Sequence, residues 1–310
     1  MRIVFCGTPD FAIPSLRAVA EKFDVVGVFT QPDRINGKRV IAPAVKTEAL
    51  RLGLPVFQCE NISKDGFEQL KALEPDCMVT CAFGHFLYRK VLALPKYGVI
   101  NVHGSILPKF RGASPVQSAV LAGEKETGVT IMKTAFEMDA GDILLVEKTE
   151  IGETETAGEL FDRLSILGAD ALVKGLELIE NGQAIFVPQD GNKATFCEKF
   201  HKEYGKLSFD KTPEELRRFV LGLNPWPSAY TRLPNGKLFK IHKLVVSNEK
   251  FDCEVGKVVY CDSKRGLVVA CKDGSVVLTE VQEEGGRKMD AESFILGHDI
   301  SGVVLGTDRE

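Results

Sequence analysis

The sequence predicts an α/β fold in which a doubly wound, mostly parallel sheet is followed by a smaller β domain. A chain of 310 residues is long enough for about two domains. Its first half alternates apolar, β-branched runs with helical patterns, and strands that are almost wholly apolar are typical of a parallel sheet covered on both faces. Near the C-terminal end, short strand patterns alternate with turn sequences, which predicts a separate antiparallel domain.

The elements of the first domain alternate along the chain as this fold requires. Strands are expected at residues 2–6, 24–30, 55–58, 76–81 and 99–102, and helices at 14–22, 44–52, 64–73 and 115–122. Two further strands, 128–134 and 143–147, flank a turn at 138–141. A long helix at 156–180 closes the domain, because Thr156 suits its start and Asn181-Gly182 suits its end.

The C-terminal part follows a segment without sustained periodicity. Residues 187–205 are rich in turn formers and lysine, so we interpret them as a linker between domains at 1–186 and 206–310. Thr212-Pro213-Glu214-Glu215 forms a capping box that predicts a helix to about residue 223. Strands are expected at 229–233, 238–246, 256–260, 266–271 and 275–281. These short strands favour a small, oligonucleotide-binding-type (OB-like) barrel, with a plain β-sandwich as the alternative.

Charge is unevenly distributed along the chain. The totals of 39 basic and 43 acidic residues give a net charge of -4, which taken alone argues against a nucleic-acid partner. Residues 81–120, however, carry five basic side chains and no acidic one, and residues 191–250 carry 12 against 6, whereas 121–190 carry 5 against 15. Such sorting is expected for a protein with one polyanion-facing surface, and also for solvated faces of unrelated helices.

The eight cysteines and the N-terminal segment limit the classes of protein that remain. No cysteine pair has the C-x-x-C spacing of zinc or thioredoxin-like sites, and the length disfavours a secreted disulfide scaffold. The N-terminal apolar run is too short for a signal sequence, and no stretch approaches 18 apolar residues. We therefore expect a cytoplasmic protein without a membrane span.

The segment 99–115 carries the most informative polar residues. Asn101 and His103 are two residues apart at the end of a strand, so an extended backbone places them on the same side. Ligands of doubly wound sheets bind at the carboxyl ends of the strands. An amide that donates to an oxyanion, beside an imidazole that exchanges a proton, suits nucleophilic addition to a carbonyl. A purely structural role for this pair is the alternative.

Asp139 and Asp142 lie in a glycine-containing turn between two apolar runs. One carboxylate could orient the imidazole and move protons through water, or both could serve only the local hydrogen bonds of the turn. Nearer the N-terminus, Gly7 is expected to form a tight strand-to-helix connection, since the G-x-G-x-x-G spacing of dinucleotide sites is absent.

A basic segment follows the second predicted strand. Arg34, Lys38 and Arg39 lie in a loop that proline and glycine interrupt. This arrangement is expected either for an ordinary solvated loop or for a contact with phosphate or nucleic acid.

Six segments together resemble the methionyl-tRNA formyltransferase family. They are GTPDFA at 7–12, VGVFTQPDR at 26–34, INVHGSILPKFRGASPVQ at 100–117, ETGVTIMK at 126–133, MDAGDIL at 138–144 and NPWPSAY at 224–230. The N-x-H, S-x-L-P and D-x-G-D patterns are shared by formyltetrahydrofolate-dependent formyltransferases in general. GTPDFA, FTQPDR and NPWP restrict the resemblance to the enzymes that act on tRNA.

The resemblance implies a Rossmann-like catalytic domain with a C-terminal OB-like barrel, acting as a monomer. It implies transfer of a formyl group from 10-formyltetrahydrofolate to the α-amine of methionyl-initiator tRNA, without a metal. The family's functional residues correspond to catalytic Asn101, His103 and Asp139, to folate-contacting Ser105, Ile106, Leu107 and Pro108, and to tRNA-binding Arg34, Lys38 and Arg39.

For the chemistry, we expect Asn101 and a protonated His103 to donate to the oxyanion, while Asp139 keeps His103 charged and removes a proton through water. A formyltransferase that acts on a sugar-nucleotide amine is the nearest alternative. An RNA-binding module with a degenerate α/β domain is the alternative from another class.

Overall fold

The computed structural model describes residues 1–37 and 39–306. The chain forms two compact units. The first unit contains Met1–Pro115, Glu126–Glu150 and Phe161–Glu198, and the second contains Val116–Lys125, Ile151–Leu160 and the chain from Lys199 onward. Within the described ranges, no helix is long and apolar enough to cross a membrane.

The first unit is built around a seven-stranded sheet with the order β10-β9-β7-β6-β1-β2-β5. Its parallel strands are β1 (Arg2–Gly7), β2 (Asp24–Thr30), β5 (Val56–Gln58), β6 (Cys77–Cys81) and β7 (Val99–His103). The antiparallel strands β9 (Glu126–Lys133) and β10 (Ile143–Glu150) extend the sheet beyond β7. This mostly parallel α/β sheet confirms the predicted fold class of the N-terminal region. The chain crosses from one half of the sheet to the other between β1 and β6, which is where doubly wound folds bind ligands.

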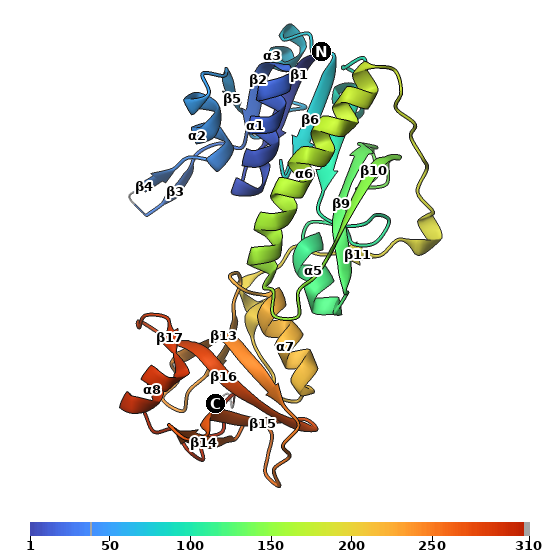
Figure 1. Ribbon diagram of the computed structural model, residues 1–310. Coiled ribbons are helices and arrows are strands. Elements are labelled where there is room, and N and C mark those ends of the chain that lie inside the picture. Colours follow the sequence, from blue (N-terminus) through green and yellow to red (C-terminus); the bar gives the residue numbers. More distant parts are fainter. Residues whose placement is uncertain (38, 307–310) are drawn as a thin grey trace. The chain divides into compact units, whose positions relative to one another are not determined.

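Helices cover both faces of this sheet (Figure 1). They are α1 (Ile13–Lys22), α2 (Ala44–Arg51), α3 (Phe67–Ala72), α4 (Arg89–Leu92) and most of α6 (Ala157–Glu180), with a short 3-10 turn at η1 (Asp10–Ala12). On one face, Val4 and Met78 share a buried cluster with Leu70 of α3. On the other, α6 approaches closely enough that a Cβ at Gly168 would lie 3.0 Å from Val102. Because both faces of the sheet are buried, its parallel strands need apolar side chains on both sides, and the residues of these strands are mostly apolar.

Two small β pairs lie outside the main sheet. The basic segment forms a hairpin of β3 (Arg34–Asn36) and β4 (Arg39–Ile41) rather than the loop expected from the sequence. A second pair joins β8 (Arg111–Gly112) to β11 (Phe196–Cys197) in parallel, and the 3-10 turn η2 (Gly191–Lys193) precedes β11. Residues 187–198 of the segment interpreted as a linker therefore belong to the first unit and contain regular structure there, whereas 199–205 belong to the second unit.

The second unit contains a separate antiparallel sheet with the order β12-β13-β16-β15-β14, and β17 pairs with β16. Its strands are β12 (Ala229–Arg232), β13 (Leu238–Ser247), β14 (Val258–Asp262), β15 (Gly266–Cys271), β16 (Gly274–Glu283) and β17 (Met289–Asp290). The remaining elements are α5 (Pro115–Ala122), η3 (Lys202–Gly205), α7 (Pro213–Gly222) and α8 (Ala291–Gly297). Thr212 and Glu215 form the predicted capping box at the start of α7.

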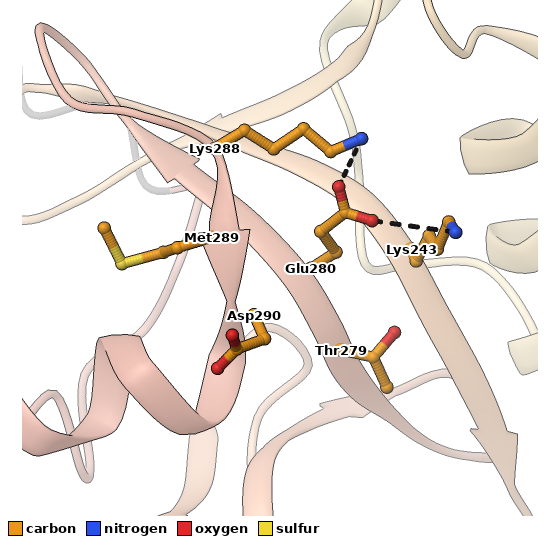
Figure 2. A pocket seen from close by; sticks show the side chains of 6 residues that line it. All are labelled: Lys243, Thr279, Glu280, Lys288, Met289 and Asp290. Carbon is orange, nitrogen blue, oxygen red and sulfur yellow. Dashed lines mark ion pairs between the residues drawn. The ribbon is translucent and has the colours of Figure 1, made fainter.

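An open hollow of about 410 Å³ lies on this second unit (Figure 2). Its lining residues are Lys243, Thr279, Glu280, Lys288, Met289 and Asp290. Glu280 pairs with both lysines, with 3.7 Å between its carboxylate and Lys243 Nζ. The hollow is therefore of mixed charge and contains none of the catalytic residues expected from the sequence.

Candidate active site

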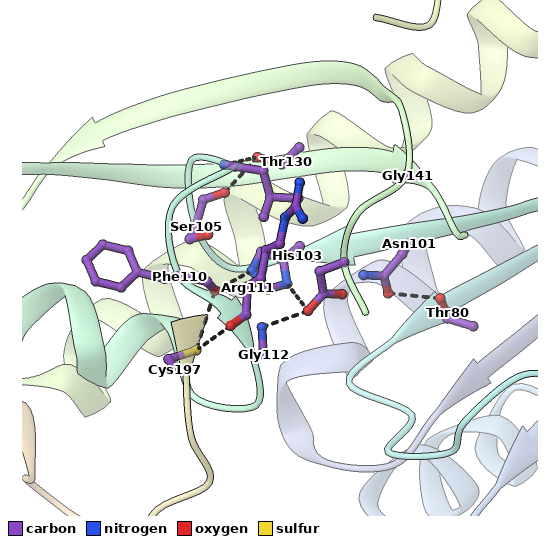
Figure 3. A network of polar contacts seen from close by, with 12 residues as sticks. Thr80, Asn101, His103, Ser105, Phe110, Arg111, Gly112, Thr130, Gly141 and Cys197 are labelled. Carbon is purple, nitrogen blue, oxygen red and sulfur yellow. Dashed lines mark hydrogen bonds and ion pairs between the residues drawn. The ribbon is translucent and has the colours of Figure 1, made fainter. Parts of the chain in front are cut away.

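The three residues predicted to be catalytic lie on β7 and in the turn after β9. Asn101 and His103 lie two positions apart on β7, and Asp139 lies in the turn between β9 and β10. Asp139 Oδ2 is 3.6 Å from His103 Nδ1, so the structure brings two of the predicted catalytic residues together from segments 36 positions apart. Figure 3 shows the labelled Asn101 and His103 within the network of polar contacts. Ordinary strand alternation puts Asn101 on the same face as His103.

The Asn101 amide is oriented by the neighbouring strand. Thr80 of β6 lies opposite Asn101 in the parallel register, and its hydroxyl donates a 2.8 Å hydrogen bond to Asn101 Oδ1. Because the carbonyl end accepts this bond, the NH₂ end of the amide is the end that can donate to a substrate. The Thr80 side chain is buried and its backbone belongs to a central strand, so this orientation is firmly held.

The His103 ring is buried, with 5% of its surface exposed, and both of its nitrogens face protein groups. Nε2 lies 3.0 Å from the backbone oxygen of Phe110, and Nδ1 faces Asp139. A carbonyl oxygen has no proton to give, so Nε2 carries the hydrogen and donates it. In the neutral imidazole, Nδ1 is then the nitrogen with the free lone pair.

The pKa of His103 is shifted in the direction opposite to that expected from the sequence. Burial lowers the pKa of His103 below its ordinary value, and this effect outweighs the opposing influences of Asp139 and of the hydrogen bond to Phe110. This direction favours the neutral imidazole, whereas the sequence analysis expected Asp139 to keep His103 charged. The physical reason is that an almost completely buried cation loses its hydration, and one carboxylate at 3.6 Å does not replace it.

Two glycines allow the Asp139 turn to approach the catalytic strand. The N–H of Gly112 donates a 2.8 Å hydrogen bond to Asp139 Oδ2. A Cβ on Gly112 would overlap the carbonyl oxygen of Cys197, and one on Gly141 would overlap that of Lys133. Asp139 itself has φ +49°, a left-handed conformation that Asp tolerates better than most residues.

Asp142, the second acidic residue of this turn, contributes to the sheet through its backbone. Its carbonyl accepts a 2.9 Å hydrogen bond from the N–H of Lys133. This bond continues the β9–β10 ladder into the turn, and it is consistent with the structural role that the sequence allowed for Asp142.

The predicted folate-contacting loop is tightly folded on itself. The buried Ser105 hydroxyl donates to Lys109 O at 2.7 Å, and the Ser105 carbonyl accepts from Thr130 at 2.7 Å. Leu107 is buried, while Ile106 and Pro108 are half-buried. The side chain of Ser105 thus fixes the shape of the loop, and the part of this loop left to meet a ligand is its backbone and its half-buried residues.

The predicted tRNA-binding residues lie on the β3–β4 hairpin. Arg34 and Arg39 are both exposed, and Arg34 Nη2 donates to Gln31 Oε1 at 2.7 Å. Lys38 lies outside the described residues. Ile35 is 80% exposed and Val40 68% exposed, so the hairpin presents apolar as well as cationic side chains to solvent.

Several residues of the site had no signal in the sequence. Thr80 is an ordinary strand threonine, and Gln189 falls in the segment interpreted as a linker. Gln189 nevertheless bonds the backbone of the Asp139 turn and the Arg111 side chain. Within residues 1–37 and 39–306, no group of three or more His, Cys, Asp or Glu side chains could hold a metal ion.

Comparisons with known proteins identify the family of this chain. The family profile "Formyl transferase" matches residues 1–176, and "Formyl transferase, C-terminal domain" matches residues 199–299. The methionyl-tRNA formyltransferase of Lachnospira eligens is 44% identical over 315 residues, covering 99% of this chain and 100% of the relative. The methionyl-tRNA formyltransferase of Bacillus subtilis is 42% identical over 315 residues, covering 100% of this chain and 99% of the relative.

Solved structures share the fold at lower identity. The sugar 3N-formyl transferase WlaRD, solved with dTDP and 5-N-formyl-THF, has a TM-score of 0.67 and 18% identity, covering 91% of this chain and 97% of that one. HypX from Aquifex aeolicus, in complex with tetrahydrofolic acid, has a TM-score of 0.62 and 17% identity. The match covers 96% of this chain and 47% of the HypX chain. With both family profiles matched and identities above 40% over nearly the whole length, the chain belongs to the formyl transferase family, among the methionyl-tRNA formyltransferases.

Proposed function

We propose that this protein transfers the formyl group of 10-formyltetrahydrofolate to the α-amino group of methionyl-initiator tRNA, giving N-formylmethionyl-tRNA for translation initiation. The observation that carries the proposal is the similarity to methionyl-tRNA formyltransferases, at 44% and 42% identity over nearly the full chain. The sugar-nucleotide alternative is disfavoured, because the sugar formyltransferase with a similar fold is only 18% identical.

The reaction requires an oxyanion donor and a path for one proton. The amine nitrogen bonds to the formyl carbon, the carbonyl oxygen becomes an oxyanion, and the bond from carbon to the folate N10 then breaks. The proton released by the amine returns to N10, so atoms and charge balance. We assign the oxyanion contact to the NH₂ group of Asn101, whose orientation Thr80 fixes.

His103 and Asp139 carry the proton in this proposal. Because Nε2–H is bonded to Phe110 O, Nδ1 is the atom that accepts the proton from the attacking amine, directly or through one water. Asp139, 3.6 Å from Nδ1, stabilises the imidazolium that forms. A neutral resting imidazole suits this role better than the protonated one expected from the sequence, since it begins as a base.

An exposed aromatic cluster beside the Asp139 turn fits the ring system of a folate. Phe86 packs edge-on against Phe136 at 5.2 Å and against Tyr88 at 5.4 Å. These three side chains are 42–49% exposed, and the neighbouring Met138 is 64% exposed. Burying such apolar surface against a flat ring is favourable. We propose that the folate contacts this cluster together with the loop of Ser105, Ile106, Leu107 and Pro108.

Two further regions are proposed to bind tRNA. The β3–β4 hairpin offers Arg34 and Arg39, together with Lys38 by sequence, for contacts with phosphates. The antiparallel sheet of the second unit is proposed to form an OB-like barrel that also binds the tRNA. The 12 basic against 6 acidic residues of 191–250 support that role.

The decisive experiment offers 10-formyltetrahydrofolate with three acceptors: methionyl-initiator tRNA, methionyl-elongator tRNA and a sugar-nucleotide amine. We expect formylation of the initiator tRNA, detected as acid-precipitable formylmethionyl-tRNA. Transfer to the sugar nucleotide alone would overturn the proposal. Asn101→Ala and His103→Ala, each expected to lower kcat by about 10²-fold or more, test the site itself.

A further inference from the structure

Residues 189–197, which we call the strap, run across the loop and the turn that carry the reacting groups. We propose that Gln189 and Thr195 of the strap are positioning residues that fix Asp139 and His103 relative to each other. This inference rests on the proposed function. The inference goes beyond that function by assigning a catalytic consequence to a segment whose sequence is typical of a linker.

Gln189 joins the Asp139 turn to the loop of Arg111. Its Nε2 donates to Asp139 O at 2.8 Å and to Gly141 O at 2.7 Å. Its Oε1 accepts from Arg111 Nε at 3.1 Å and Nη2 at 2.8 Å. Both amide hydrogens and both lone pairs of the carbonyl oxygen are therefore used, and only an amide can make this combination, because two acceptors lie on one side and a cation lies on the other.

Thr195 acts on the other partner, His103, through Phe110. The Thr195 hydroxyl accepts a 2.8 Å hydrogen bond from Phe110 N–H, and the Thr195 carbonyl accepts from Arg111 N–H at 2.8 Å. Phe110 has φ +58°, and its carbonyl is the group that binds His103 Nε2 at 3.0 Å. Thr195 thus fixes the peptide that orients the imidazole and leaves Nδ1 facing Asp139.

Both contacted backbones need such support. Asp139 and Phe110 each adopt a left-handed conformation, which is unfavourable for a residue other than glycine. In the β8–β11 pair, Phe196 lies opposite Arg111 and Cys197 opposite Gly112, so the strap also aligns the N–H that binds Asp139. Displacing reacting groups by about 1 Å is enough to cost roughly 10²-fold in rate.

Three variants separate the contacts. Gln189→Met keeps the length of the side chain and removes all four hydrogen bonds. Gln189→Glu keeps an acceptor for Arg111 but cannot donate to the two carbonyls. Thr195→Val removes the contact with Phe110.

We expect kcat to fall about 10- to 100-fold in both Gln189 variants and several-fold in Thr195→Val, with KM for both substrates within about twofold. Thr195→Ser should restore most of the turnover lost in Thr195→Val.

Gly191→Ala is the matched control. Gly191 lies in the strap two residues from Gln189, and a Cβ there would meet no atom within 4 Å. Turnover of this variant should equal that of the wild type. Wild-type kcat in Gln189→Met would overturn the role of Gln189, and normal turnover in Gln189→Glu would reduce that role to binding Arg111.

A titration of His103 by NMR tests positioning independently of turnover. In Gln189→Met, Asp139 is no longer held at 3.6 Å from Nδ1, so the pKa of His103 should fall below its wild-type value. An unchanged His103 titration combined with a lowered melting temperature would assign Gln189 a general structural role and overturn the inference. If the wild type fails to formylate methionyl-tRNA, the proposed function fails, whereas this titration still decides whether the strap positions the pair.

Discussion

The N–H of Gly112 and the Nδ1 of His103 converge on a single oxygen, Asp139 Oδ2, at 2.8 and 3.6 Å. The Gly112 bond fixes that oxygen on the side of His103. A carboxylate anchored by a backbone donor keeps its charge in place while the neighbouring imidazole changes its own. The proton transfer proposed above would therefore depend on a main-chain group as much as on the two side chains.

Gly112→Ala should lower kcat by about 10²-fold or more. Gly112 has φ +123°, and an added Cβ would overlap the carbonyl oxygen of Cys197, so the β8–β11 pair must separate and the N–H must leave Asp139. Steady-state kinetics and melting temperature measure the effect. Gly182→Ala, at φ +69° with no atom near its Cβ, shares the backbone strain and should keep wild-type turnover. Normal kinetics in Gly112→Ala would contradict the assigned geometry.

Thr80→Val should lower kcat roughly tenfold by releasing the Asn101 amide, without loss of folate affinity. The substitution is nearly isosteric and removes the 2.8 Å hydrogen bond to Asn101 Oδ1. Thr30→Val is the control, because the Thr30 hydroxyl is equally buried at a strand end and donates to Gln31 O instead. Equal losses in the two variants would show that the effect is general to the sheet.

The pKa of His103 should lie below 6.5 in the folded protein, and Asp139→Asn should lower it further. Burial is the largest cause of the depression, and removing the Asp139 charge removes an influence that raises the pKa. The unfolded chain then binds a proton at a higher pH than the folded one, so the free energy of unfolding should decrease as the pH falls below about 6.5. NMR titration, with the signal assigned by its loss in His103→Gln, measures the pKa. A value above 6.5 would contradict the neutral imidazole.

Neutralising the hairpin should weaken the use of tRNA without affecting folate. Arg34→Gln combined with Arg39→Gln should lower kcat/KM for charged tRNA and reduce the salt slope of binding by about 1–2, one unit for each lost phosphate contact. Lys22→Gln with Lys71→Gln is the control, because these exposed lysines lie in the last turns of α1 and α3, before the amino ends of β2 and β6, whereas the hairpin follows the carboxyl end of β2. Identical salt slopes in all three proteins would remove the hairpin from the tRNA interface.

Glu48→Gln should destabilise the first unit in a pH-dependent manner. Hydrogen bonds from Arg51 and then Arg17 lower the pKa of the buried Glu48 carboxyl from 4.5 to about 2. The stabilisation is therefore complete above about pH 4.5 and is lost as the pH falls towards 2. Melting temperatures should differ most near neutral pH and converge in acid. Glu21→Gln, on the exposed side of α1, is the control and should leave the melting temperature at neutral pH unchanged.

The sequence predicted the main sheet well because its strands are buried on both faces. The ranges expected for β2 and α5 agree with the observed Asp24–Thr30 and Pro115–Ala122. The β3–β4 hairpin was missed because its strands have three residues each and its apolar side chains face solvent, so no burial pattern identifies it. β17 and α8 were missed for a related reason, since a two-residue strand and a two-turn helix contain too little periodicity.

The candidate site could be predicted only in part. Asn101 and His103 follow from strand alternation, and Asp139 from the turn at the end of a neighbouring strand. Thr80, Gly112 and Gln189 act through hydrogen bonds to residues 21, 27 and 50 positions away. No local pattern of residues encodes such partners, because the packing of segments at the carboxyl ends of the strands determines which residues meet. The resting charge of His103 likewise depends on burial, which the spacing of residues does not reveal.

The strap also bears on how the chain can be shortened or cleaved. A fragment ending at residue 186 would retain every strand of the main sheet yet lack Gln189, Thr195 and β11. Limited proteolysis within the exposed stretch from Asp190 to Lys193 would cut the same support while leaving the sheet folded. Insertions or deletions between Gln189 and Cys197 should be selected against as strongly as changes in the catalytic loop. Gln189 has to reach the Asp139 turn while Thr195 reaches Phe110 and Arg111, so the number of residues between these two contacts matters.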